Sequence, residues 1–191
     1  MTCQKSGLIS KRKTPPTSGG RLRKHGRAQL QRGCASHLEA ALKTLGKPND
    51  ALEIRGRILA LRADDTALWG VMDVTQMVCH LREPYLFALS PDPVQQVPLP
   101  IPATAAKYMA LHSPLAWPKH LPTLPEFKIG GARMATTTFA GDCASLIEAF
   151  DRFCAVPNLT KDHPFFTTMS HADWMRWGYL HADHHLRQFG R

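Results

Sequence analysis

Apolar side chains recur at helical spacing in three long stretches of the sequence. From Phe139 they follow at steps of four, three, one, three and four residues, ending at Cys154, which is the pattern of a helix with one apolar face. Residues 73–89 and 170–189 show the same period, whereas the alternation of a β-strand occurs nowhere at useful length. The fold class is therefore predicted to be all-α.

Two of these predicted helices have well-marked first residues. Asp73 precedes one helix with Gln76 in the capping-box position, and Ser170 precedes the last helix with Asp173 in the same position. Such pairs satisfy the free N–H groups of a first helical turn. Pro84 lies inside the helix that begins after Asp73, so a kink or an early end is expected there, although the helical spacing continues to about residue 89.

Three shorter stretches, at residues 38–45, 50–62 and 103–111, also have helical spacing. The last of them lies in a proline-rich segment, residues 90–137, which contains nine of the 15 prolines. A connection this long is unusual in a compact domain. It fits a crossover, because the chain must travel back along a bundle when the helices before and after it run parallel.

The basic charge of the chain is concentrated at its N-terminus. Residues 1–49 contain 11 Lys and Arg and one acid, whereas residues 50–191 contain 13 basic and 14 acidic side chains. Residues 1–33 have no acid and too few apolar side chains to offset the entropy of ordering. We predict a disordered basic tail at residues 1–33 and a folded domain at residues 34–191.

The same charge distribution bears on partners and location. A basic tail can bind nucleic acid or an anionic membrane loosely, but the nearly neutral remainder predicts no specific nucleic-acid binding. No apolar run reaches the roughly 18 to 20 residues of a membrane span, and no secretory signal is evident. Five scattered cysteines without C-x-x-C spacing predict reduced thiols and a cytoplasmic protein.

A group of histidines in the last predicted helix indicates a metal site. His181 and His185 are four residues apart, so they share one helical face and can offer two imidazoles to one ion. His184 is three residues from His181 and could replace His185 as a ligand. His80 lies among apolar residues of the helix that begins after Asp73, and it is the best candidate for a third ligand. Nitrogen ligands favour zinc, nickel or iron.

Simpler interpretations of these residues remain open. H-x-x-x-H occurs by chance on solvated helix faces, and a buried histidine such as His80 is more often a hydrogen-bonded structural residue. Ala182 stands where a zincin protease has its general-base Glu, and neither nucleotide-binding glycine loops nor G-x-S-x-G are present. Cys79, Cys143 and Cys154 are predicted to be small core residues.

Several motifs together carry a resemblance to a known family. They are Trp69-Gly70, the helix of Gln76-Met77-x-x-His80-Leu81, His163-Pro164-Phe165-Phe166 before Trp174, and the ending His184-His185-Leu186-Arg187-Gln188-Phe189-Gly190. Residues 50–191 thus resemble the DinB-like superfamily of metal-binding four-helix bundles, and more closely an uncharacterised branch of it. The resemblance implies a metal triad of His80, His181 and His185 and a long crossover between helices 2 and 3 of the bundle. Some members are S-transferases that use bacillithiol, mycothiol or glutathione, and many have no known activity.

These observations lead to a hypothesis about function. We expect a metal-dependent enzyme that acts on a small-molecule thiol or electrophile by thiol transfer or hydrolysis, since three imidazoles leave a coordination position open. Arg187 and Gln188 could hold a polar substrate, and His184 is the nearest candidate general base. The alternative is a non-catalytic bundle in which the metal serves stability or sensing. A monomer and a homodimer both remain open.

Overall fold

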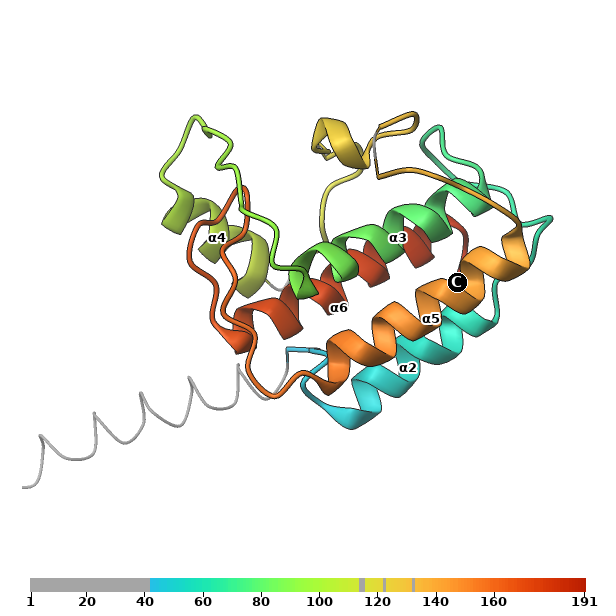
Figure 1. Ribbon diagram of the computed structural model, residues 1–191, viewed down its shortest axis with the longest axis horizontal. Coiled ribbons are helices and arrows are strands. Elements are labelled where there is room, and N and C mark those ends of the chain that lie inside the picture. Colours follow the sequence, from blue (N-terminus) through green and yellow to red (C-terminus); the bar gives the residue numbers. More distant parts are fainter. Residues whose placement is uncertain (1–41, 114–115, 122, 132) are drawn as a thin grey trace, which may run out of the picture. The chain divides into compact units, whose positions relative to one another are not determined.

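Five α-helices and one 3-10 helix form the regular structure of this computed structural model, which describes residues 42–113, 116–121, 123–131 and 133–191. The elements are α2 (Pro48–Leu59), α3 (Val74–Leu89), α4 (Ala103–His112), η1 (Pro125–Phe127), α5 (Phe139–Ala155) and α6 (His171–Gln188) (Figure 1). In these ranges the only β pairing is an isolated bridge between His163 and Thr167. The predicted all-α class is confirmed. No helix in the described part of the chain is both long and apolar enough to cross a membrane.

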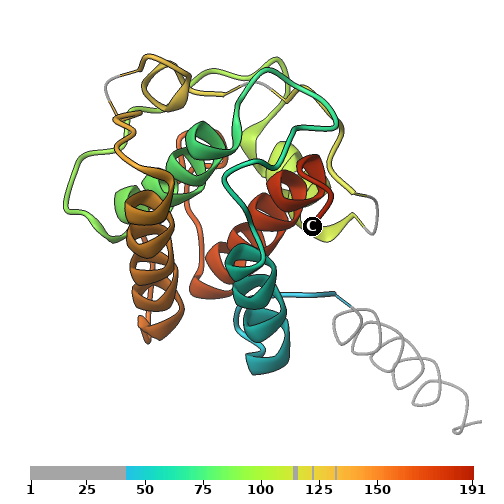
Figure 2. The same ribbon diagram turned by 90° about the vertical axis from the view of Figure 1, so that its right-hand side faces the viewer.

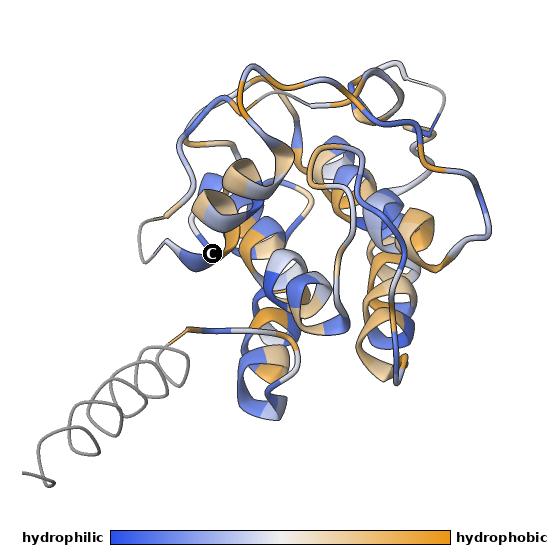
Figure 3. Cartoon of the chain, turned by 90° about the vertical axis from the view of Figure 1, so that its left-hand side faces the viewer, coloured by the Kyte–Doolittle hydropathy of each residue, from blue (hydrophilic) through white to orange (hydrophobic). Residues whose placement is uncertain are grey.

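The four longest helices pack against one another around a shared core. α3 packs on α5 and α6, and α2 packs on the same two helices (Figures 1 and 2). Each helix carries both apolar and polar residues (Figure 3), and each contributes a large side chain that is at most 1% exposed: Ile54, Tyr85, Phe150 and Trp174. Burial of such a side chain contributes about 1.5–3 kcal/mol. This core therefore fixes α3 relative to α6, the two helices that carry the predicted metal ligands.

Both predicted capping boxes are present. Asp73 accepts a hydrogen bond from the Gln76 amide at 2.8 Å and donates its own amide to the Gln76 side chain at 3.0 Å. Ser170 and Asp173 make the same pair of bonds at the start of α6. The early end that Pro84 could cause does not occur, and α3 continues to Leu89.

The segment before α2 differs from its prediction. The predicted tail at 1–33 lies entirely outside the described residues, and the predicted helix at 38–45 lies partly outside them. Residues 42–47 form turns and bends rather than a helix. Leu45 is nevertheless buried, and its amide donates to the carbonyl of Met175 on α6 at 3.1 Å. A Cβ added at Gly178 would lie 2.9 Å from Leu45 Cδ1, so the glycine permits this close approach. Leu45 is thus apolar because it packs on α6, and not because it belongs to a helix.

The proline-rich connection between α3 and α5 contains α4 and η1, and part of it returns to α3. Phe127 in η1 packs with Phe87 of α3, the ring centroids being 5.9 Å apart. The guanidinium of Arg133 lies 5.3 Å from the centre of the Phe87 ring and forms an ion pair with Asp92. These contacts hold η1 against the C-terminal part of α3.

Candidate metal centre

The three predicted ligand residues meet between α3 and α6. Each of His80, His181 and His185 offers a ring nitrogen, and these nitrogens all lie within 4.8 Å of one another. The Nε2 atoms of His80 and His181 are 3.4 Å apart. Two nitrogens bound to one tetrahedral ion at about 2.0–2.1 Å lie about 3.4 Å apart, so this spacing suits a shared metal. The three side chains are only 5%, 7% and 9% exposed.

A backbone carbonyl in the connection between α3 and α5 holds His80 in one tautomer. Its Nδ1 lies 2.9 Å from the carbonyl oxygen of Phe127, in η1. A carbonyl can only accept, so Nδ1 carries the proton and Nε2 carries a lone pair. Burial lowers the pKa of His80, which keeps the ring neutral. The lone pair on Nε2 is therefore available where the three imidazoles meet.

His185 is held by a relay that begins in the loop before α3. The carbonyl oxygen of Trp69 accepts from Gln188 Nε2 at 2.6 Å, which fixes the orientation of the Gln188 amide. Gln188 Oε1 then accepts from His185 Nδ1 at 3.0 Å. His185 Nε2 consequently carries a lone pair, just as His80 Nε2 does. Outer hydrogen bonds of this kind orient histidine ligands in metal sites.

Gly70 allows this relay to form. Its φ is +85°, in the left-handed region that favours glycine, and a Cβ at this position would overlap Gln188 Nε2. The neighbouring Leu68 amide donates to the Gln188 carbonyl at 2.7 Å. The loop therefore lies tightly against the end of α6.

His181 completes the cluster. With its ring included, the centre has fewer N–H donors than nitrogen lone pairs. Its ring stacks on Trp177, with a centroid separation of 4.7 Å and an interplanar angle of 17°. Burial, and then the nearby His185 and His80, lower its pKa well below the usual value, so the ring is neutral and can donate at most one proton. Because His80 and His185 both present lone pairs to the centre, that proton cannot satisfy both. A cation would accept the lone pairs that all three rings direct to the centre, and the residues present therefore fit a metal ion. The other ring nitrogen of His181, Nδ1, is buried and has no partner among the described residues.

The other residues singled out from the sequence have different surroundings. His184 is buried but does not belong to the group of three. Arg187 forms an ion pair with Asp183 at 2.8 Å, and Asp183 also pairs with Arg57 at 2.9 Å. Gln188 is 3% exposed and its amide is used by Trp69 and His185. The idea that Arg187 and Gln188 hold a substrate thus finds no support, because both already have partners.

Sequence reasoning missed two groups that orient the ligands, the carbonyls of Phe127 and Trp69. A backbone carbonyl has no side-chain signature, so nothing in the sequence distinguishes these two from any other. Trp69-Gly70 was visible as a motif, but the role of its glycine becomes apparent only from the contact with Gln188.

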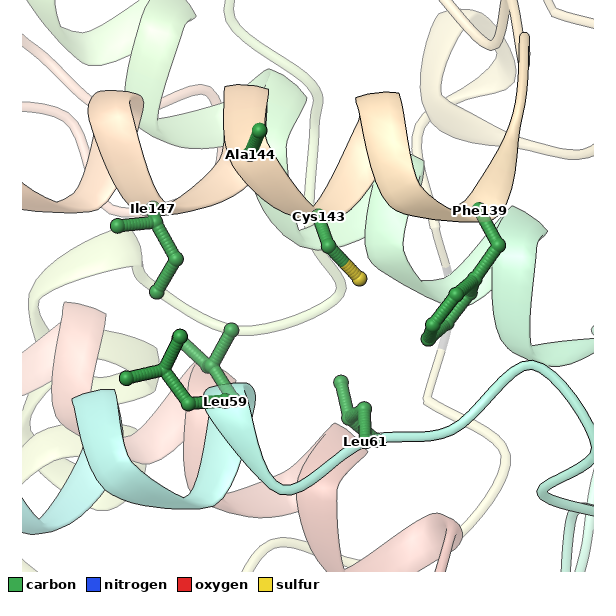
Figure 4. A pocket seen from close by; sticks show the side chains of 7 residues that line it. Leu59, Leu61, Phe139, Cys143, Ala144 and Ile147 are labelled. Carbon is green, nitrogen blue, oxygen red and sulfur yellow. The ribbon is translucent and has the colours of Figure 1, made fainter.

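None of the three cysteines in the described residues belongs to the group formed by the three imidazoles. Cys79 is fully buried, as predicted, and its Sγ lies 3.3 Å from the guanidinium of Arg82. Cys143 and Cys154 are only half-buried, so the prediction of core cysteines holds for them in part. Cys143 lines an apolar pocket of about 350 Å³ between α2 and α5, together with Ile58, Leu59, Leu61, Phe139, Ala144 and Ile147 (Figure 4).

Comparison with known proteins gives one partial match. A family model described as "Protein of unknown function (DUF1569)" matches residues 126–191. That span contains α5, α6 and the carbonyl of Phe127, and it includes His181 and His185 but not His80. No curated protein and no solved structure matches the chain.

Proposed function

We propose that His80, His181 and His185 hold one divalent transition metal. The observation that carries the proposal is the convergence of two Nε2 lone pairs, each fixed by an acceptor on the far side of its ring. Nitrogen ligands favour zinc, nickel or iron over magnesium and calcium, which prefer oxygen. The contacts among α2, α3, α5 and α6, together with the long connection between α3 and α5, support a DinB-like four-helix bundle.

We further propose that the protein is a metal-dependent enzyme, a thiol-dependent S-transferase or a hydrolase. Three histidine ligands leave a fourth coordination position for a substrate atom. A metal in this site would lower the pKa of a thiol or water bound to it. The protein's own residues orient the ligands: Phe127 holds His80, Gln188 holds His185, and Trp177 holds the ring of His181. Their small exposure limits the access of bulk water to the centre.

The proposal is tested first by metal content and then by activity. His181→Ala should lose stoichiometric metal, as measured by elemental analysis of purified protein, whereas His112→Ala, an exposed histidine of α4, should retain it. In assays that combine small thiols with electrophilic substrates, His185→Ala should be inactive. Cys79→Ala should stay active, because Cys79 does not belong to the group formed by the three imidazoles. Retention of one ion per chain by all three single histidine variants would show that the triad is wrong.

A second candidate function is a non-catalytic metal site that stabilises the bundle. It is favoured by the burial of the three imidazoles, none of which is more than 9% exposed. In that case the fully metallated protein should be inert towards every thiol and electrophile, while removal of the metal should lower the melting temperature. Turnover that depends on the metal would instead support the enzymatic function over the non-catalytic one.

A further inference from the structure

Phe127 contacts α3 at two points that lie on one side of the helix. Its carbonyl oxygen is 2.9 Å from Nδ1 of His80, and its ring packs on that of Phe87, with the centroids 5.9 Å apart. His80 and Phe87 are seven residues apart, which is about two helical turns, so both face the same side. The position of the Phe127 ring on Phe87 therefore determines where its carbonyl meets His80.

The backbone and the apolar packing around Phe127 provide few other attachments. Among the described residues, the backbone hydrogen bonds of 123–131 are made within that stretch or to Met134, and none reaches an α-helix. The apolar cluster in this part of the chain is small, and its buried members in the described ranges are Phe87, Leu124 and Phe127. A further interaction that fixes the Phe127 ring thus has a large effect on the position of its carbonyl.

Arg133 provides such an interaction. Its guanidinium lies 5.3 Å from the centre of the Phe87 ring and 6.0 Å from that of Phe127, which is the range of a cation–π contact with each. It also forms an ion pair with Asp92. This ion pair contributes little stability by itself, because the two side chains are 31% and 44% exposed. Its effect is to keep the guanidinium next to both rings at once.

We propose that Arg133 is a positioning residue of the metal centre. By fixing the Phe127 ring, it keeps the Phe127 carbonyl on Nδ1 of His80, and this hydrogen bond orients the imidazole towards the ion. The inference rests on the proposed metal site. Arg133 acts on one ligand only, because His185 is oriented by Gln188 and the loop before α3.

The test compares two ring protons in the full chain loaded with Zn²⁺. NMR with isotope-labelled histidine follows the Nδ1–H of His80 and that of His185. Arg133→Met keeps the apolar stem of the side chain and removes its charge. We expect this variant to exchange the His80 proton with water about ten-fold faster and to leave the His185 proton unchanged. Its Kd for Co²⁺ should rise about ten-fold, which is the lower end of the range for loss of an outer hydrogen bond.

Matched variants separate positioning from a general loss of stability. Arg133→Lys keeps the charge and should restore most of the wild-type behaviour. Arg55→Met removes an arginine of similar exposure, 38% against 31%, from an ion pair with Asp151, and it should change neither proton. Gly70→Ala disturbs the other relay and should speed the exchange of the His185 proton alone.

The outcomes distinguish the positioning role from the metal site itself. If Arg133→Met does not fold, as judged by circular dichroism, Asp92→Asn replaces it and should act in the same direction, because it releases the guanidinium. Equal acceleration of both ring protons, or an unchanged His80 proton in a folded variant, overturns the inference. A wild-type chain that binds neither Zn²⁺ nor Co²⁺ overturns the metal site.

Discussion

At the scale of single residues, one amide group decides which nitrogen of His185 faces the other imidazoles. Gln188 could present either its oxygen or its nitrogen to His185, and the carbonyl of Trp69 removes the choice by accepting from the nitrogen. The resulting tautomer leaves a lone pair at the centre. A residue that touches neither His185 nor the centre can therefore affect metal binding, provided that it positions Gln188.

Gly70 is such a residue, and Gly70→Ala should weaken metal binding. The new Cβ would overlap Gln188 Nε2 and displace the amide. Loss of an outer hydrogen bond to a histidine ligand typically lowers metal affinity about 10–100-fold. The dissociation constant is measured by competition with a chromophoric chelator.

Gly130→Ala provides the matched control for this substitution. Gly130 also has a positive φ, +77°, but a Cβ there would meet no atom within 4 Å. Both substitutions therefore strain the backbone, and only Gly70→Ala disturbs Gln188. Equal affinities for metal in the two variants would contradict the role assigned to the relay.

At the scale of helices, the capping box of α6 should contribute measurably to stability. Ser170→Ala removes the side-chain oxygen that accepts from the Asp173 amide at 3.1 Å. Loss of such a cap costs about 1 kcal/mol, which lowers the melting temperature of a chain of this size by about 2–4 °C. The control is Ser145→Ala, an exposed position inside α5. Thermal unfolding of the two variants should differ, and equal shifts would show that the cap is dispensable.

The helices differ in how well the sequence predicted them. Period and caps located α3, α5 and α6, because an amphipathic face and a capping residue are both visible in the sequence. The prediction at 38–45 was wrong for its described part, since Leu45 is buried by contact with α6 and not as part of a helix. The pairing of His181 with His185 follows from helical geometry. The carbonyls of Trp69 and Phe127 could not be predicted, because only the tertiary fold brings them to the ligands.

At the scale of the whole molecule, buried neutral histidines make folding depend on pH. Burial lowers the pKa of His163 to about 3, whereas the unfolded chain protonates this residue near its ordinary value of about 6.5. The unfolded state thus binds more protons between these two values. The stabilising contribution is complete above about pH 6.5 and is lost as the pH falls towards 3, at about 1.4 kcal/mol per pH unit for one histidine.

Substitution of His163 should reduce this dependence. His163→Asn keeps an acceptor for the Phe165 amide, which donates to His163 Nδ1 at 3.2 Å, and it removes the titrating ring. The free energy of unfolding, measured with urea from pH 7 to pH 4, should fall less steeply in this variant by about 1.4 kcal/mol per pH unit. His112→Asn, at an exposed position, should retain the wild-type slope. An unchanged slope in His163→Asn would refute this assignment.

The ligand residues lie far apart along the chain, and His80 is separated from His181 by 101 residues. His181 and His185 share one face of α6, so they can bind an ion weakly once this helix has formed, before the rest of the chain has folded. His80 joins them only when α3 docks on α6 and η1 has returned to α3. A bound ion would thus be a removable cross-link that closes a loop of about a hundred residues. Only fully folded chains would then bind the metal tightly, and partly folded chains would lose it.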